Sequence, residues 1–230
     1  MLKKILFTGI FCLFSFAAFA DSSQPLRRAL TAPEKAADDV QKLTAYLTKP
    51  FKDDYDKLQV IAYWIASHIA YDGYKYNGEK INRRDINYQY DVLKARAGIC
   101  TDFANLFKNM ADIAGVKKVE IVSGYVLENQ TKLQRRYLRR KMPEIGHSWN
   151  RAEIDGRKFF IDTTFMAQGI IGQKGQRSGT SRHKSEIKKR SRGITEINSN
   201  INMFYFDFTP KQELNRFHNV HVCDKYIENN

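Results

Sequence analysis

The stretch Gly98-Ile99-Cys100-Thr101-Asp102-Phe103 contains the cysteine on which the predicted chemistry of this chain depends. Cys100 follows a glycine and precedes a segment with helical periodicity, so we expect it in the first turn of a helix. The free N–H groups and the dipole of a first turn favour the thiolate, which is the nucleophilic form of cysteine. Two later motifs contain His147 (GHSW, residues 146–149) and Asp162 (FIDTT, residues 160–164). The ordered trio predicts a nucleophile, a base and a carboxylate that orients the base.

A predicted hairpin brings the histidine and the aspartate together. Residues 147–154 and 157–163 have the alternation of strands, and Asp155-Gly156 between them is a hairpin signal. A hairpin centred on this dipeptide pairs positions whose numbers sum to about 311. His147 then faces residue 164, and Asp162 lies a diagonal step away, so both side chains can point to one face. The predicted pairing follows from the position of the turn alone and is independent of either motif.

Helical patterns come first along the chain, and strand patterns follow. We expect helices over 31–47 (with Thr31 as N-cap and Glu34 closing a capping box), over 53–71 and over 100–114, and a short helix or turn over 91–97. Strands are expected over 119–127, 147–154, 157–163, 204–208 and 220–222. This order predicts an α+β fold, in which N-terminal helices and the helix of the cysteine pack on an antiparallel sheet.

Residues 1–20 have the features of a secretory signal. Two lysines precede an apolar run over 5–16 that is short for a membrane span, and Ala18-Phe19-Ala20 matches the cleavage pattern. We expect Asp21 at the mature N-terminus, and Cys12 to leave with the signal. Since no later stretch is apolar enough to cross a bilayer, the sequence predicts export to a periplasm or to the medium.

After the signal, we expect a short linker over 21–32 and one domain over 33–230. The domain carries basic insertions near 129–146 and 172–200, which are either binding loops or solubilising insertions. The net charge of +13, from 38 Lys and Arg against 25 Asp and Glu, favours an anionic envelope component or membrane surface as partner, although a solvated surface explains it equally. Nucleic acid is disfavoured, because the basic insertions lack interleaved aromatic residues.

Histidines and cysteines outside the trio allow other interpretations. Trp64 and His68 lie on or beside the apolar face of a predicted helix, where we expect core packing for Trp64 and a hydrogen-bonded or exposed imidazole for His68. His218, His221 and Cys223 supply too few ligands on one strand face for a metal site, so no metal and no cofactor are expected.

The state of Cys100 itself is also open. A lone cysteine is usually buried and inert, but Gly98 allows a close backbone approach that an inert position would not need. Cys100 and Cys223 are the two cysteines left after removal of the signal, so they could form a disulfide. Such a disulfide would block the nucleophile until it was reduced.

The chain resembles the transglutaminase-like superfamily over residues 58–221. The resemblance lies in residues 64–72, 91–104, 115–116, 124–125, 147–150 and 160–164. The tail over 204–221 is similar to bacterial and fungal members related to cytokinesis and kyphoscoliosis proteins. The resemblance implies a papain-like and transglutaminase-like core, with Cys100 as nucleophile, His147 as base and acid, and Asp162 as the orienting carboxylate.

This resemblance implies cysteine acyl-transfer chemistry, and the lack of an acidic cluster argues against calcium control. The favoured hypothesis is an exported peptidase or amidase that acts on a protein or peptide through a thioester at Cys100. The alternative is a non-catalytic or cross-linking relative that binds an anionic envelope component or a protein partner through the basic insertions. Likeness of fold does not choose between these hypotheses.

Overall fold

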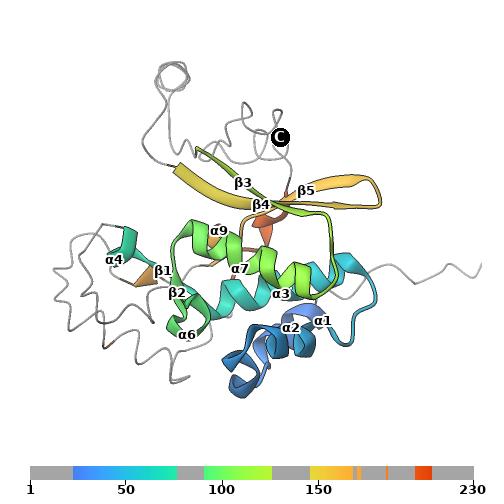
Figure 1. Ribbon diagram of the computed structural model, residues 1–230, viewed down its shortest axis with the longest axis horizontal. Helices are drawn as coiled ribbons and strands as arrows, with labels where there is room; N and C mark the ends of the chain where they lie inside the picture. Colours follow the sequence, from blue (N-terminus) through green and yellow to red (C-terminus); the bar gives the residue numbers. More distant parts are fainter. Residues whose placement is uncertain are drawn as a thin grey trace, which may run out of the picture.

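The computed structural model describes residues 23–76, 91–125, 146–167, 170–171, 185 and 200–208. Helices come first in the described chain, and most of the strands follow (Figure 1). The helices are α1 (Ser23–Leu30), η1 (Glu34–Asp38, a 3₁₀ helix), α2 (Val40–Thr48), α3 (Asp54–His68), α4 (Gly73–Tyr76), α6 (Val92–Ala95), α7 (Cys100–Ile113), α9 (Thr163–Met166) and η3 (Met203–Tyr205, a 3₁₀ helix).

The strands form two sheets. The antiparallel sheet has the order β3-β4-β5-β7 and consists of β3 (Val119–Tyr125), β4 (Gly146–Ile154), β5 (Arg157–Ile161) and β7 (Phe206–Phe208). A smaller parallel sheet has the order β2-β1-β6 and consists of β1 (Ala70–Asp72), β2 (Ala97–Gly98) and β6 (Ile170–Ile171). The predicted α+β class, with helices packed on an antiparallel sheet, is confirmed.

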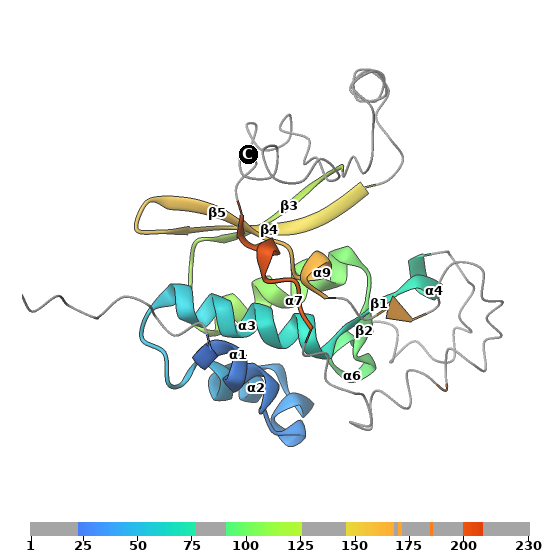
Figure 2. The ribbon, with the colours of Figure 1, turned by 180° about the vertical axis from the view of Figure 1, so that it is seen from behind.

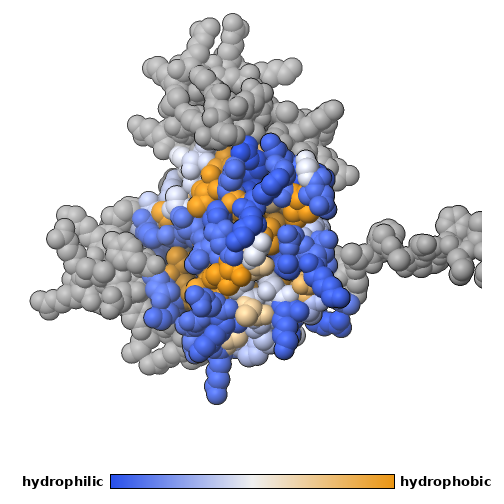
Figure 3. Space-filling model, turned by 45° about the vertical axis from the view of Figure 1, so that its right-hand side comes forward, coloured by the Kyte–Doolittle hydropathy of each residue, from blue (hydrophilic) through white to orange (hydrophobic). Residues whose placement is uncertain are grey.

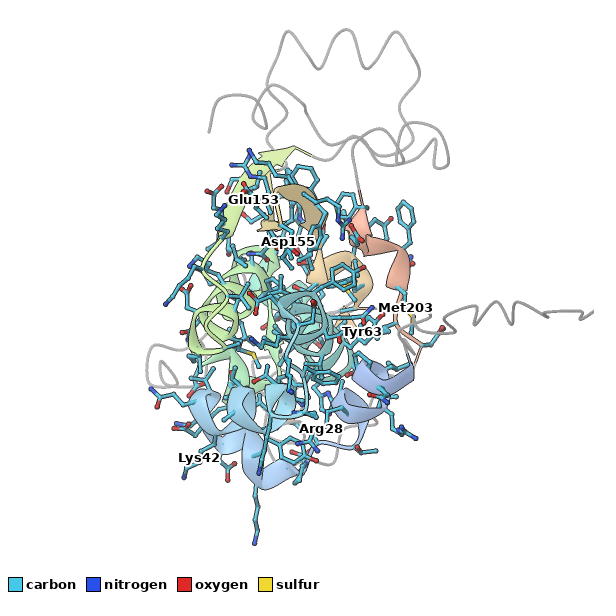
Figure 4. All side chains as sticks on the ribbon, turned by 90° about the vertical axis from the view of Figure 1, so that its right-hand side faces the viewer. Arg28, Lys42, Tyr63, Glu153, Asp155 and Met203 are labelled. Carbon is cyan, nitrogen blue, oxygen red and sulfur yellow. The ribbon has the colours of Figure 1, made fainter. Side chains whose placement is uncertain are left out.

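Helix α3 is the centre of the fold. The antiparallel sheet lies on one side of α3, α7 and α9, and α1 and α2 lie on the other side (Figures 1 and 2). Every residue of α3 from Leu58 to His68 is buried, as expected of a helix that is enclosed on all sides. Asp53 caps its first turn, because its carboxylate accepts a hydrogen bond of 2.7 Å from the Tyr55 N–H. In Figure 4, Tyr63 of this helix lies in the interior of the molecule.

Helix α7 places its first turn beside both sheets. Phe103, Phe107 and Met110 are fully buried, whereas Thr101 and Asn105 on the opposite face are exposed. This apolar stripe packs the helix against α3 and β4, and Gly115, with a φ of +84°, follows its C-terminal end. The predicted helix over 100–114 is therefore present with nearly the expected bounds.

The N-terminal helices differ from the prediction. Residues 23–30, which lie in the predicted linker, form α1 and pack on α3. The single helix expected over 31–47 is wrong, because η1 and α2 replace it and Asp39 caps α2 through a hydrogen bond of 2.8 Å from the Lys42 N–H. Thr31 instead donates its hydroxyl hydrogen to the Arg27 carbonyl at 2.8 Å, and Glu34 forms an ion pair with Arg96 at 3.0 Å. The two residues predicted to cap a helix, Thr31 and Glu34, therefore make other contacts instead.

Other predicted elements are shorter than expected. The helix expected over 53–71 ends at His68, because the chain there enters β1 and pairs with β2 and β6. The strand expected over 157–163 ends at Ile161, and the one expected over 204–208 begins as η3. The small parallel sheet was not predicted, because its strands have only two or three residues and show no periodicity.

The described surface is mostly hydrophilic. In Figure 3, apolar patches on the face shown are separated by polar side chains. In Figure 4, Glu153 and Asp155 lie at the hairpin end of the sheet, and Arg28 and Lys42 lie on the helical layer below. Within the ranges that the structure describes, no helix combines the length and apolar character needed to cross a membrane.

Several sequence predictions concern residues outside the described ranges. These are the signal over 1–20, most of both basic insertions, the strand over 220–222, and the cluster of His218, His221 and Cys223. Each of these remains a prediction from sequence.

The imidazole of His68 is buried at the C-terminal end of α3. It stacks on the Trp64 ring with a centroid distance of 4.6 Å, and its Nδ1 lies 3.0 Å from the Trp64 carbonyl oxygen. Its Nε2 is buried and has no hydrogen-bond partner within the described part of the chain. Burial, opposed by the Trp64 hydrogen bond and reinforced by the charge of Arg96, lowers the pKa of His68 to about 4. The core packing expected for Trp64 is confirmed. Of the two roles expected for His68, exposure is wrong, because the imidazole is buried with Nδ1 hydrogen-bonded.

We expect His68 to make the fold sensitive to acid. Because its pKa is about 4 when folded and 6.5 as the ordinary value, its contribution is present above pH 6.5 and is lost as the pH falls toward 4. The full loss corresponds to roughly 3 kcal/mol in the free energy of unfolding. Denaturant unfolding of the wild type and His68→Phe between pH 4 and 7.5 should show the wild type losing stability more steeply. Parallel curves for the two proteins would contradict this assignment.

Candidate active site

Cys100 is the first residue of α7, and the turn before it depends on Asp102. The Asp102 carboxylate accepts a hydrogen bond of 2.8 Å from the Ile99 N–H and forms an ion pair with Lys75 at 2.6 Å. A Cβ atom on Gly98 would lie 2.7 Å from the Cβ of Asp102, which is closer than real Cβ contacts allow. Glycine is therefore required at position 98, because any side chain there would displace the residue that holds the first turn of α7.

His147 and Asp162 form a buried pair at the end of the antiparallel sheet. His147 Nε2 lies 2.6 Å from Asp162 Oδ2, and both side chains are buried. The paired positions of β4 and β5, such as Asn150 with Ile161, sum to the predicted 311. The ladder ends at that pair, however, so His147 does not face residue 164 within the sheet as expected. The two side chains meet because the chain leaves β5 at Asp162.

Asp162 is fixed by the start of α9 and by the tail of the described chain. Its Oδ1 accepts a hydrogen bond of 3.0 Å from the Phe165 N–H, and its own N–H donates to the Tyr205 carbonyl at 2.9 Å. One carboxylate oxygen thus caps α9 while the other is directed at the imidazole. Since the cap and the ion pair use different oxygens, the carboxylate can serve both.

Two aromatic rings hold the imidazole of His147. The Phe165 ring stacks on it with a centroid distance of 4.6 Å and an interplanar angle of 26°. The Trp149 ring lies 5.7 Å away at 22°. Sequence reasoning did not identify Phe165 as part of the site, although its place three residues after Asp162 matches the turn that this aspartate caps.

The thiol and the imidazole alter each other's pKa. Burial raises the pKa of Cys100, but the hydrogen bond and charge of His147 and the N–H groups of Ser148 and Thr101 outweigh it, so the pKa is lowered. Burial would lower the pKa of His147, but the charge and hydrogen bond of Asp162, and then those of Cys100, raise it to about 10. These opposite shifts favour a thiolate paired with an imidazolium at neutral pH.

Since Nε2 of His147 bonds to Asp162, Nδ1 is the nitrogen left to face the thiol. The Thr101 N–H belongs to the first turn of α7, and the Ser148 N–H belongs to the part of β4 that β5 does not cover. The sulfur therefore lies at a junction of helix and sheet, next to an ionisable nitrogen and two N–H donors. This arrangement can stabilise a thiolate and move a proton.

Asn150 connects the strand of His147 to the helix of Cys100. It is fully buried, and its Nδ2 donates to the Ala104 carbonyl of α7 at 3.1 Å and lies 3.4 Å from the Glu120 carbonyl of β3. This side chain fixes β4 against α7 one turn beyond the cysteine.

A separate cavity of about 640 Å³ opens along the outer face of α7. Its lining includes four aspartates, among them Asp102 and Asp91, but neither Cys100 nor His147. The cavity therefore adjoins the turn before the cysteine without containing the trio.

Within the described ranges, no group of three or more possible ligands could hold a metal ion. Cys100 carries a free thiol in the structure, and Cys223 lies outside the described residues.

The amino-acid sequence of this chain matches that of a known family. A family model for the transglutaminase-like superfamily matches residues 41–162, a range that contains Cys100, His147 and Asp162. The kyphoscoliosis peptidase of Mus musculus is 26% identical over 132 residues, which cover 57% of this chain and 19% of the mouse protein. The kyphoscoliosis peptidase of Homo sapiens is 25% identical over 136 residues, which cover 59% and 19%. The chain thus matches about a fifth of the length of these relatives.

A solved structure of a candidate cysteine protease from Cytophaga hutchinsonii is 21% identical, with a TM-score of 0.38, over 60% of this chain and 42% of that one. This structural likeness is partial, and the family assignment rests on the sequence model instead. Because that model covers more than half of the 230 residues, the chain belongs to the transglutaminase-like superfamily.

Proposed function

We propose that the protein is a cysteine acyl-transfer enzyme, and that its reaction is the hydrolysis of peptide or amide bonds through a thioester at Cys100. The observation that carries this proposal is the alignment of Cys100, His147 and Asp162, with 2.6 Å between the imidazole and the carboxylate. The lowered pKa of Cys100 supports it, because a thiolate is the attacking species. Membership of a superfamily that includes peptidases supports it as well.

In the first half of the reaction, the Cys100 sulfur attacks the substrate carbonyl carbon and forms a C–S bond. The carbonyl oxygen becomes an oxyanion, for which the Cys100 backbone N–H at the helix start is one donor. The C–N bond then breaks, and His147 gives its proton to the departing amine. The product of this step is a thioester of Cys100 and a free amine.

In the second half, a water molecule attacks the thioester carbon while His147 accepts its proton. The C–S bond breaks, the acid leaves, and His147 is protonated again beside the thiolate. Asp162 holds the imidazole in place through the contact of 2.6 Å and stabilises its charged form. An amine in place of water would give transfer, so the two outcomes share every step up to the thioester.

Comparing wild type and Cys100→Ala on a library of peptides and intact envelope proteins tests this function. Under reducing conditions, the wild type should produce new termini or released amines, and Cys100→Ala should produce at least about 10³-fold less. Mass spectrometry of the products gives the bond and the rate. Equal products from both proteins would contradict the proposal. If neutralising residues 135–141 then abolished envelope binding, the non-catalytic alternative would hold.

The charge of Asp162 should set the pH at which Cys100 reacts. In Asp162→Asn the buried imidazole loses the partner that keeps it charged, so the pKa of Cys100 should rise. We expect the midpoint of iodoacetamide alkylation of Cys100 to move up by at least about one pH unit, with roughly tenfold slower labelling near pH 6.5. The labelled Cys100 peptide is quantified by mass spectrometry.

Asp155→Asn is the matched control, since it makes the same carboxylate-to-amide change at the exposed turn of the hairpin. Its alkylation profile should match that of the wild type. A midpoint in Asp162→Asn that equals the wild-type midpoint would show that Asp162 does not tune the thiol.

We further propose that the chain is exported, and that its basic insertions contact an anionic envelope or membrane surface. The support is the signal pattern over 1–20 and the net charge of +13. Residues 1–25 fused to a reporter that folds only where disulfides form should give an active reporter that begins at Asp21. The same fusion with Lys3→Glu and Lys4→Glu should be exported less. An inactive, uncleaved wild-type fusion would exclude the export proposal.

A further inference from the structure

The first turn of α7 is held by one carboxylate, that of Asp102. Ile99 is the N-cap residue of this helix, and its side chain has no atom that can accept a hydrogen bond. One half of a capping box is nevertheless present, because Asp102 Oδ2 accepts a hydrogen bond of 2.8 Å from the Ile99 N–H. In return, the Ile99 carbonyl accepts one of 2.9 Å from the Asp102 N–H. Asp102 thus binds both backbone groups of the residue before Cys100.

Lys75 binds the same carboxylate from outside the helix. Its Nζ lies 2.6 Å from Asp102 Oδ2, and because the two side chains are only 28% and 21% exposed, water screens this pair only in part. Lys75 belongs to α4, which follows β1, and both elements lie beside one end of α7 (Figures 1 and 2). The Lys75 N–H also donates a hydrogen bond of 3.0 Å to Asp72 Oδ1. Lys75 therefore contacts two carboxylates, one through Nζ and the other through its backbone.

Cys100 lies in the same electrostatic surroundings as these two carboxylates. Burial, and then the negative charge of Cys100, followed by those of Tyr76, Asp72 and Asp102, raises the pKa of Tyr71 on β1. The thiolate and both carboxylates thus act on one hydroxyl. Like charges disfavour one another, so a thiolate at Cys100 is opposed by the two carboxylates. A positive charge that offsets them favours the thiolate.

The charged and titratable groups around Cys100 come from several elements. The imidazole of His147 on β4 is paired with Asp162 at 2.6 Å, and it lowers the pKa of Cys100. The groups from the other elements are Tyr71 and Asp72 on β1, Lys75 and Tyr76 on α4, and Asp102 on α7. Among all of these groups, His147 and Lys75 are the two that carry a positive charge when protonated.

We propose that Lys75 is a positioning residue, whose ammonium group binds Asp102 at the turn before Cys100 and offsets the charge of that carboxylate next to the thiolate. This inference rests on the proposed acyl-transfer function. Cys100 and Asp102 are two residues apart on α7, so their side chains do not face each other. Asp102 therefore acts on the sulfur as a nearby charge, and Lys75 reduces that effect while Asp102 keeps its hydrogen bond to Ile99.

Removing either charge of this pair should shift the reactivity of Cys100, in opposite directions. We expect Lys75→Met to raise the pH midpoint of iodoacetamide alkylation by about half a unit, with roughly threefold slower labelling below the midpoint. Asp102→Asn should lower the midpoint by a similar amount, because its amide oxygen can still accept the Ile99 N–H while the charge of Lys75 is no longer offset. The labelled Cys100 peptide is quantified by mass spectrometry at each pH.

Two further variants separate charge from loss of structure. Lys75→Met combined with Asp102→Asn removes both charges, so its midpoint should return to the wild-type value. Lys75→Arg keeps the positive charge and should keep the midpoint. A merely structural role predicts instead that the double variant is at least as impaired as Lys75→Met, and that result would overturn the proposal.

Lys57→Met is the matched control, since Lys57 forms the same kind of ion pair with Asp54, at 2.7 Å, at the start of α3. Its midpoint should equal that of the wild type. Shifts of the same sign in Lys75→Met and Asp102→Asn, or no shift in either, would overturn the assignment of Lys75 and leave the proposed function standing. A wild-type Cys100 with the alkylation midpoint of a free cysteine would overturn the proposed function itself.

Discussion

The hydrogen bond between His147 and Asp162 depends on β5 leaving the sheet at Ile161 while β4 continues to Gly146. The last pair of the β4–β5 ladder is Asn150 with Ile161, so residues 146–149 of β4 are not covered by β5. The uncovered edge leaves the Ser148 N–H free to bond to the sulfur of Cys100. It also lets Asp162 turn toward the imidazole at 2.6 Å. The contact of the Ser148 N–H with Cys100 and the contact of Asp162 with His147 therefore both depend on where β5 ends.

The ionisation of Cys100 depends on the pairing of buried charges in the site. Buried charges are tolerated when they are paired, and removing one partner leaves the other uncompensated. The charges of Asp162, His147 and Cys100 are paired in this way. The carboxylate favours the charged imidazole, and the imidazole favours the ionised thiol. Uncharged side chains position these three residues. Asn150 joins β4 to α7, and the rings of Phe165 and Trp149 lie against the His147 imidazole. Positioning and ionisation are thus supplied by different side chains.

Sequence reasoning predicted the parts of this fold that have strong local signals. The register of the hairpin followed from Asp155-Gly156, and α7 followed from its apolar stripe and from Gly115. The parallel sheet of β1, β2 and β6 could not be predicted, because strands of two or three residues have no period and pair across long stretches of chain. The sequence predicted a close backbone approach at Gly98. It could not predict that a side chain there would clash with Asp102, because this contact depends on how the turn before α7 folds. The stacking of Phe165 on His147 could not be predicted either, because it joins two segments that are separate in the sequence.

Formation of a covalent intermediate on Cys100 can be tested by trapping that intermediate. The wild-type protein is mixed with p-nitrophenyl acetate in reducing buffer, quenched with acid within the first turnover, digested and analysed by mass spectrometry. The acetyl group should be found on the peptide that contains Cys100, and free hydroxylamine should remove it, as it does a thioester. Acetylation of other residues but not of Cys100 would contradict this role of Cys100. Hydrolysis of the ester without any acetylated protein would contradict it as well.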